Sequence, residues 1–296
     1  MTKITGPFIA IVTPFDKEER VDTTALRRQV NRQAAAGNGV FFAGTNGEFY
    51  ALSFEEKVRV AETCVEAAQG KVPVLGHIGE ISTSQTIALG KVIARLGVKA
   101  VSAITPSFIA CSQAELIDHY RKVADALSVP VYLYNIPART GNTLEPATAR
   151  VLADHPNIIG IKDSAGSQES LDAFLEIARD RSDFDVLVGP DSLILHGLRN
   201  GAAGCISGLG NVCPVTVNGI HSAFVRGDLT AAEAHQTRFS ALRKELYALG
   251  FPPAMVKRAL CHAMPDVGWS RAPVLIAEEV DRKIAEISKR YVEAAS

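Results

Sequence analysis

The fold is decided by a pattern that residues 129–162 display once in full, VPVYLYNIPARTGNTLEPATARVLADHPNIIGIK. An apolar run ends at Asn135, a stretch of helical period begins near Glu145-Pro146, and a second apolar run covers Ile158–Lys162. Short β-branched runs on either side of a helical stretch are typical of a strand–helix–strand unit in a parallel sheet with both faces covered.

The same alternation recurs along the chain. The predicted strands are Phe8–Thr13, Gly39–Gly44, Val72–Ile78, Ala100–Thr105, Val129–Asn135, Ile158–Lys162, Asp185–Gly189 and Gly204–Ser207. Start signals for the intervening helices occur at Asp22, Ser53, Ser112, Ser167 and Asp191. Glu56 and Glu115 follow two of these serines at the spacing of a capping box.

Beyond the eighth predicted strand, residues 214–296 read as successive helices. Eight regular units predict an α/β fold, a (β/α)8 TIM barrel over residues 1–224 with an α-helical region over residues 225–296. A doubly wound open sheet is the alternative fold.

Composition excludes several classes of partner. The chain has 296 residues, a net charge of −1 and a sequence pI near 6.7, which favours neither nucleic acid nor an acidic membrane. The apolar run at Phe8–Val12 is too short for a signal peptide, and no later run is long enough to span a bilayer, so we expect a cytoplasmic protein. Five scattered cysteines without a C-x-x-C pair favour buried thiols over disulfides or zinc.

Polar residues follow the carboxyl ends of the predicted strands, where barrel enzymes carry their chemistry. Lys162 closes an apolar strand there, and burial of an amine can lower its pKa by about 3 units. A neutral lysine amine is a nucleophile that condenses with ketones. The alternative is a structural lysine in a salt bridge with Asp163.

Three further features surround this lysine in the predicted barrel. Tyr134 ends the neighbouring strand, where its phenol can transfer protons or simply pack at the barrel rim. Thr45 and Asn46 lie between two glycines, in a turn that can hold a carboxylate or serve only as a connection. Arg139 can clamp a second carboxylate or lie on the surface.

Together these pieces resemble one known family. The matching segments, spread over nearly the whole chain, are Ile9–Phe15, Gly44–Glu48, Tyr134–Pro137, Gly160–Asp163 and Gly204–Ser207. In this order and on these strands, they resemble the dihydrodipicolinate synthase / N-acetylneuraminate lyase family of class I aldolases.

The resemblance implies a (β/α)8 barrel with a helical C-terminal region, usually assembled as a homotetramer. It implies that Lys162 forms an imine with pyruvate, or with a 2-oxo acid containing a pyruvate moiety, and that Tyr134 donates and accepts protons. Thr45 and Asn46 would hold the 1-carboxylate, and Ile206 would line the pocket through its backbone. No metal or organic cofactor is implied, because the imine is the electron sink. The substrate-binding candidates also include Gly189, which ends the seventh predicted strand, and Asp191, which follows it.

The chain departs from the family pattern at several positions. Asn46 replaces the usual threonine of the turn, and Asp163-Ser164 replaces Glu-Ala, and both changes favour the 4-hydroxy-2-oxoglutarate aldolase branch. Phe108 replaces a tyrosine that completes a proton relay across the dimer interface in many members, so the relay would run through Thr45 and water or be dispensable. Arg139 instead matches the synthase branch.

These departures rank three hypotheses. The first is reversible aldol cleavage of 4-hydroxy-2-oxoglutarate or a 2-keto-3-deoxy sugar acid. The alternative is 4-hydroxy-tetrahydrodipicolinate synthase, which condenses pyruvate with aspartate semialdehyde. The third is a non-catalytic barrel that binds a keto acid, motivated only by Phe108. A sialic acid lyase or a dehydratase is a further alternative, and the sequence does not identify the aldehyde partner.

Overall fold

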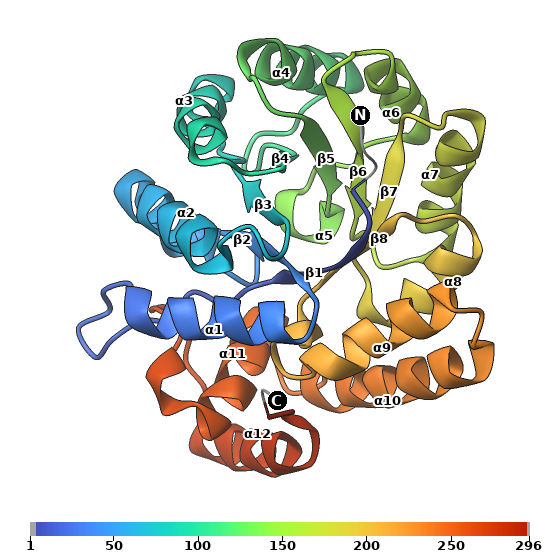
Figure 1. The fold of residues 1–296 in the computed structure, drawn as a ribbon. Helices are drawn as coiled ribbons and strands as arrows, with labels where there is room; N and C mark the ends of the chain where they lie inside the picture. The colour runs from blue at the N-terminus through green and yellow to red at the C-terminus, as the bar shows by residue number, and fades with distance from the viewer. Residues whose placement is uncertain (1–3, 295–296) are drawn as a thin grey trace. The chain divides into compact units, whose positions relative to one another are not determined.

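The computed structural model describes residues 4–294 and confirms the predicted fold class (Figure 1). Eight parallel strands close into a barrel in the order β1 to β8. Their bounds are β1 Gly6–Ala10, β2 Gly39–Phe42, β3 Val74–His77, β4 Ala100–Ile104, β5 Val131–Asn135, β6 Ile158–Asp163, β7 Asp185–Val188 and β8 Gly204–Ser207.

Helices alternate with the strands and then continue to the end of the chain. The helices between strands are α1 Thr23–Ala35, α2 Phe54–Ala68, α3 Thr83–Ile93, α4 Gln113–Ala126, α5 Pro137–Thr140, α6 Pro146–Ala153, α7 Gln168–Asp180 and α8 Ile194–Arg199. The later helices are α9 Pro214–Val225, α10 Leu229–Tyr247, α11 Pro252–Ala263 and α12 Glu278–Tyr291. Five short 3-10 helices complete the elements, η1 Phe49–Ala51, η2 Ala94–Leu96, η3 Asp191–Leu193, η4 Leu209–Asn211 and η5 Pro265–Val267.

Caps confirm the helix starts predicted at Asp22, Ser53, Ser112 and Ser167. Asp191 instead begins the short η3, and α8 begins at Ile194 without a side-chain cap. Both Ser53 and Ser112 form complete capping boxes, in which the carboxylates of Glu56 and Glu115 accept a hydrogen bond from the backbone amide of the capping serine. Asp22 accepts a hydrogen bond from the amide of Ala25 and so caps α1. These side chains satisfy backbone N–H groups that the helix itself leaves unpaired.

The bounds of β1 differ most from the prediction. The strand ends at Ala10, although Ile11–Thr13 remain buried. The amide of Val12 donates to the side chain of Asn211 at 3.1 Å instead of to a neighbouring strand. The apolar run therefore predicted correctly that these residues are buried, but it was wrong that they continue the strand.

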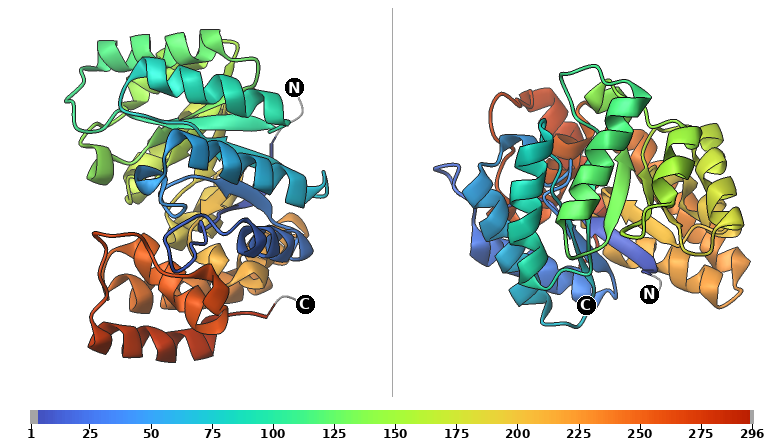
Figure 2. Two further views of the ribbon diagram at one scale, coloured as in Figure 1. Left: turned by 90° about the vertical axis from the view of Figure 1, so that its left-hand side faces the viewer. Right: turned by 90° about the horizontal axis from the view of Figure 1, so that it is seen from above.

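The chain divides into two compact units, and each is described by itself. The first unit comprises the chain up to Gly6 together with Leu75–Ile206, and the second comprises Pro7–Val74 and Ser207 onward. In the first unit β4, β5, β6 and β7 lie side by side, with helices outside them (Figure 1). In the second unit α11 packs against α12 (Figure 2). The proposed boundary at residue 224 stays a prediction.

Candidate active site

Lys162 and Tyr134 lie in contact in the first unit. Tyr134 on β5 and Lys162 on β6 are direct partners in the register of the two strands. The Lys162 Nζ atom lies 3.9 Å from the centroid of the Tyr134 ring, and both side chains are buried. The two side chains are therefore neighbours, as the sequence predicted, because parallel strands in register place their corresponding ends side by side.

His77 extends this cluster from the end of β3. Its ring meets the Tyr134 ring edge-on, with centroids 5.8 Å apart and an interplanar angle of 83°. The side chain of His77 is only 2% exposed. His77 lies at the end of the third predicted strand, but no role was assigned to it from the sequence. Its place at a strand end, two strands before that of Tyr134, is the feature that could have indicated that the two rings are near each other.

Asp163 and Asn135 form a second buried pair one residue further along the same strands. Successive side chains of a strand point to opposite faces, so this pair lies behind Tyr134 and Lys162. Asn135 Nδ2 donates to Asp163 Oδ1 at 2.8 Å, and Ser170 on α7 donates to the same oxygen at 3.2 Å. Burial raises the pKa of the Asp163 carboxyl, and the hydrogen bond from Asn135 partly offsets this effect.

The other first-unit candidates lie at the same carboxyl ends of the strands. Arg139 is an exposed residue of α5, which begins two residues after β5 ends. Ile206 is buried in β8, and Asp191 is buried at the start of η3. Gly189 is constrained to glycine, since a Cβ there would lie 1.9 Å from the Ser164 hydroxyl oxygen.

Thr45 and Asn46 belong to the second unit, in a tightly held turn after β2. Thr13 donates to the carbonyl of Gly47 at 2.7 Å. A Cβ at Gly47 would lie 3.1 Å from the Ala43 backbone, so the turn leaves no room for a side chain there. Asn46 Oδ1 is shielded from solvent and makes no hydrogen bond within residues 4–294. A shielded acceptor that makes no hydrogen bond within the protein is suited to accept one from a ligand or a water molecule.

Phe108 lies in the loop after β4 and is 95% exposed. Its backbone adopts φ +72°, a conformation that costs energy for a residue with a Cβ. Ile109 beside it is 53% exposed. The position that carries a relay tyrosine in many family members thus holds an apolar ring directed into solvent in this chain.

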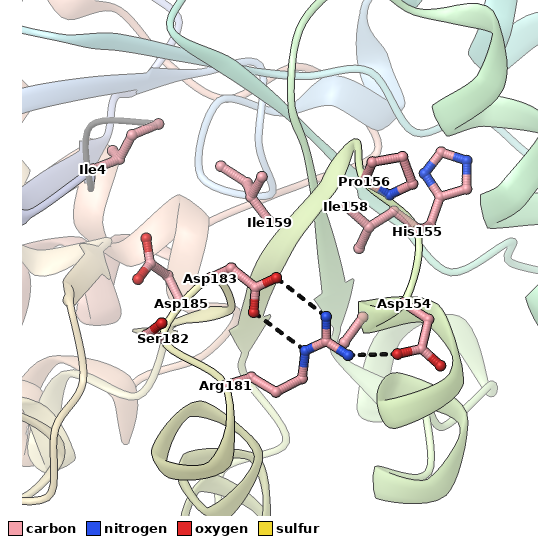
Figure 3. Close-up of a pocket in the computed structure, with 11 residues that line it drawn as sticks. Ile4, Asp154, His155, Pro156, Ile158, Ile159, Arg181, Ser182, Asp183 and Asp185 are labelled. Atoms are coloured by element: carbon pink, nitrogen blue, oxygen red, sulfur yellow. Dashed lines mark hydrogen bonds and ion pairs between the residues drawn. The ribbon is translucent and has the colours of Figure 1, made fainter.

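A separate pocket of about 570 Å³ opens at the other end of β6 and β7 (Figure 3). Ile158 and Asp185, the first residues of those strands, line it. Figure 3 shows the Arg181 guanidinium between Asp154 and Asp183, both of which it pairs with. Lys162 lies at the opposite end of β6, so this pocket is distinct from the candidate active site.

Within residues 4–294, no three His, Cys, Asp or Glu side chains are grouped as a metal site requires. No helix among the same residues is long and apolar enough to cross a membrane. All five cysteines have free thiols, and only Cys111 is not buried.

A buried lysine at a barrel strand's carboxyl end, in contact with a tyrosine, is the arrangement of a Schiff-base-forming class I aldolase or lyase. The model of the dihydrodipicolinate synthetase family matches residues 3–290, and the chain belongs to this family of enzymes. Family membership gives no support to the hypothesis of a non-catalytic barrel.

Individual relatives agree over nearly their full length. A 4-hydroxy-tetrahydrodipicolinate synthase from Hyphomonas neptunium is 38% identical over 261 residues, which cover 86% of this chain and 89% of the relative. A dihydrodipicolinate synthase structure from Bacillus anthracis matches with a TM-score of 0.91 and 29% identity, covering 98% of this chain and 99% of the other. A prophage protein of the dihydrodipicolinic acid synthase family from E. coli K12, solved in complex with pyruvate, gives a TM-score of 0.92 at 28% identity, with 97% and 98% covered.

Proposed function

We propose that the protein is a lyase in which Lys162 forms an imine with pyruvate and the resulting enamine adds to aspartate semialdehyde. The observation that carries the first half is the buried amine of Lys162, 3.9 Å from the centre of the Tyr134 ring. The neutral amine of a lysine is the nucleophile that condenses with a ketone.

In the proposed reaction the Nζ atom of Lys162 attacks C2 of pyruvate, and water leaves to form the iminium. Loss of a proton from C3 gives the enamine. C3 then forms a bond to the aldehyde carbon while the aldehyde oxygen takes up the π electron pair and a proton, which regenerates the iminium. Addition of water at C2 then breaks the bond to Nζ and releases the product from Lys162. Tyr134 donates the proton that lets hydroxide leave as water and accepts protons in the reverse direction. The iminium takes up the electron pair, so no additional electron sink is required.

The turn at Thr45 and Asn46 would hold the 1-carboxylate of pyruvate. Asn46 supports this role because the NH2 group of its amide is a hydrogen-bond donor, which an anion requires. Ile206 would line the pyruvate pocket through its backbone. Gly189 and Asp191 at the end of β7 are proposed to border the same site.

This choice of aldehyde ranks the synthase above the aldolase, whereas the sequence alone ranked the aldolase first. The family model and the synthase relative, 38% identical, both favour aspartate semialdehyde. Arg139 agrees with this choice, because an exposed guanidinium after β5 can bind the acid end of such a substrate.

Aldol cleavage of 4-hydroxy-2-oxoglutarate is the second candidate function. The amide of Asn46 in the turn favours it, and the apolar Phe108 in place of a tyrosine weakens the synthase. Its product glyoxylate also carries an acid group that Arg139 can receive. Cleavage of 2-keto-3-deoxy sugar acids has no comparable support from Arg139.

Two experiments test these proposals. Borohydride reduction in the presence of pyruvate should add a pyruvate-derived mass to the peptide that contains Lys162. An adduct on a different lysine would refute the Schiff-base assignment. Consumption of aspartate semialdehyde with pyruvate and release of pyruvate from 4-hydroxy-2-oxoglutarate should then be compared, and turnover only in the second assay would refute the synthase.

We also propose that the protein is a cytoplasmic homotetramer, as the family resemblance implies. Sedimentation velocity at several protein concentrations measures the assembly directly, and a monomer at all concentrations would contradict it.

A further inference from the structure

Glu48, which ends the turn carrying Thr45 and Asn46, has a strained backbone. Its φ and ψ angles are 56° and 39°, in the left-handed region that a side chain disfavours. Ala43 on the other side of the turn is also left-handed, at φ +49°. Such conformations persist only where the surrounding contacts impose them.

The contacts that impose the conformation of Glu48 come from far along the chain, within the same unit. Its Oε1 accepts a hydrogen bond at 2.8 Å from Nζ of Lys257, on α11, and both side chains are 1% exposed. Its Oε2 accepts from the backbone amide of Arg271 at 3.1 Å. Both oxygens of the carboxylate are therefore used, as a buried charge requires.

Arg271 fixes the residues that follow the turn. Its guanidinium pairs with Glu56, and it donates to the carbonyl of Ala51 at 2.6 Å. It also stacks on the Phe15 ring, 4.2 Å from the centroid, and Nζ of Lys257 lies 3.8 Å from the same centroid. The cluster thus surrounds η1, which begins directly after Glu48.

Backbone hydrogen bonds connect Glu48 and the residue after it to the turn. The amide of Glu48 donates to the carbonyl of Thr45 at 3.2 Å, and the amide of Phe49 donates to the carbonyl of Gly44 at 3.3 Å. We expect a change in the backbone of Glu48 to move Thr45, and with it Asn46, which lies between Thr45 and Glu48 in the chain.

We propose that Lys257, acting through Glu48, is a positioning residue for the Thr45-Asn46 turn and sets the affinity for the substrate's 1-carboxylate. This inference rests on the proposed function, in which that turn holds the carboxylate of pyruvate. Lys257 itself does not contact the substrate, and its amine is held by the carboxylate of Glu48.

The test is the Lys257→Met variant, which keeps the apolar stem and removes the charge. Borohydride trapping at Lys162 is measured over a range of pyruvate concentrations. We expect the half-saturating pyruvate concentration to rise about tenfold, the usual effect of losing a charge-assisted hydrogen bond, with the trapping rate at saturation within about twofold of wild type.

Arg258→Met is the matched control. Arg258 lies on the same helix, and its guanidinium donates to the carboxylate of Asp281 of α12 at 2.6 and 2.7 Å instead of to Glu48. This variant should melt at a lower temperature with an unchanged half-saturating concentration. An equal rise in both variants would reduce Lys257 to a general stability role and overturn the proposal.

A double variant keeps the test decisive if Lys257→Met fails to fold because it leaves the Glu48 charge buried alone. Glu48→Gln with Lys257→Met removes both charges, which proteins commonly tolerate better than one unpaired charge. It should fold and show the same rise in half-saturation, and a wild-type value in a folded variant would overturn the proposal. Failure of wild-type protein to form the Lys162 adduct would instead refute the proposed function.

Discussion

Replacing Asn135 with alanine is predicted to destabilise the fold and to slow imine formation, although Asn135 does not face Lys162. The side chain is fully buried and makes two hydrogen bonds. It donates to Asp163 Oδ1 at 2.8 Å and accepts from the amide of Leu144 at 3.1 Å. The change leaves a buried amide without its acceptor and a buried carboxylate without its shortest hydrogen bond.

The magnitude follows from these two groups. A buried N–H without a partner costs about 1–3 kcal/mol, and a buried carboxylate that loses a donor costs about 2–3 kcal/mol. Asp163 keeps weaker donors in Ser170 and Ala165, at 3.2 and 3.4 Å, so we expect a total of about 3–5 kcal/mol. For a chain of this size that corresponds to a fall in melting temperature of about 2 °C per kcal/mol.

The effect on chemistry follows from the register of β5 and β6. Asn135 and Asp163 are direct partners one step after Tyr134 and Lys162, so the lost bond loosens the strand ends that carry the reactive pair. Displacement of reacting groups by a fraction of an ångström can slow a reaction by about tenfold or more. Thermal unfolding and the rate of borohydride-trapped imine at saturating pyruvate measure the two effects separately.

Asn157→Ala is the control for stability without chemistry. Asn157 donates to the carbonyls of Ala124, Leu127 and Val129 at 2.9–3.1 Å, just before β6 begins. It should lower the melting temperature and leave the trapping rate unchanged. If Asn135→Ala also leaves the trapping rate at the wild-type value, the reasoning from strand register is refuted.

The other predictions concern single groups. Tyr134→Phe keeps the ring beside Lys162 but removes the phenol, so turnover should fall about 10²–10³-fold with little change in half-saturating pyruvate, and retention of wild-type turnover would exclude proton transfer by Tyr134. Phe108→Tyr should speed deuterium exchange at C3 of pyruvate with stability changed by less than about 0.5 kcal/mol, because Phe108 is exposed; an unchanged exchange rate would mean that the missing hydroxyl is not limiting. Burial lowers the pKa of Lys257 from 10.5 to about 8, so between these pH values the unfolded chain binds the proton more tightly than the folded chain. The free energy of unfolding of the wild type should therefore increase relative to that of Lys257→Met as the pH rises from 8 to 10.5. Denaturant titrations measure this difference. The titratable groups that face the Lys257 amine are those of Glu48, Cys261 and Arg271.

The fold was largely predictable because the barrel repeats one local pattern. Each apolar run marked a buried segment, and capping residues such as Ser53 and Ser112 marked the helix starts correctly. The predicted end of β1 was wrong. Val12 is buried as its apolar run indicated, but its amide donates to the side chain of Asn211, 199 residues away, and not to a neighbouring strand. Local patterns report burial, whereas the partner that satisfies a buried amide depends on the whole fold.

The same distinction separates the parts of the site. Lys162 and Tyr134 were predictable together because neighbouring parallel strands place their ends side by side. The ion pair between Glu48 and Lys257 was not, since 209 residues separate them and Lys257 reads as an ordinary position of an amphipathic helix. Nothing in the local sequence distinguishes a lysine with a buried partner from an exposed one.

The structure also changes what Asp163-Ser164 signifies for the choice of substrate. In the sequence these residues favoured an aldolase over a synthase. In the fold, Asp163 lies on the opposite face of β6 from Lys162, and its hydrogen bonds go to Asn135, Ala165 and Ser170. Asp163 therefore belongs to the anchoring of the strand and does not share the face on which the substrate would bind.

Ser164 has a similar explanation. Its hydroxyl lies where a Cβ at residue 189 would be, so its size is matched to Gly189 in the next strand connection. A feature of packing between β6 and β7 carries no information about an aldehyde. Arg139 can receive the acid end of either aspartate semialdehyde or glyoxylate, so it does not separate the two substrates. Asn46 is the remaining departure that favours the aldolase. If Asn46 selects the aldolase substrate, Asn46→Thr should raise the rate of aspartate semialdehyde consumption relative to the rate of pyruvate release from 4-hydroxy-2-oxoglutarate, and an unchanged ratio would remove Asn46 as a selector.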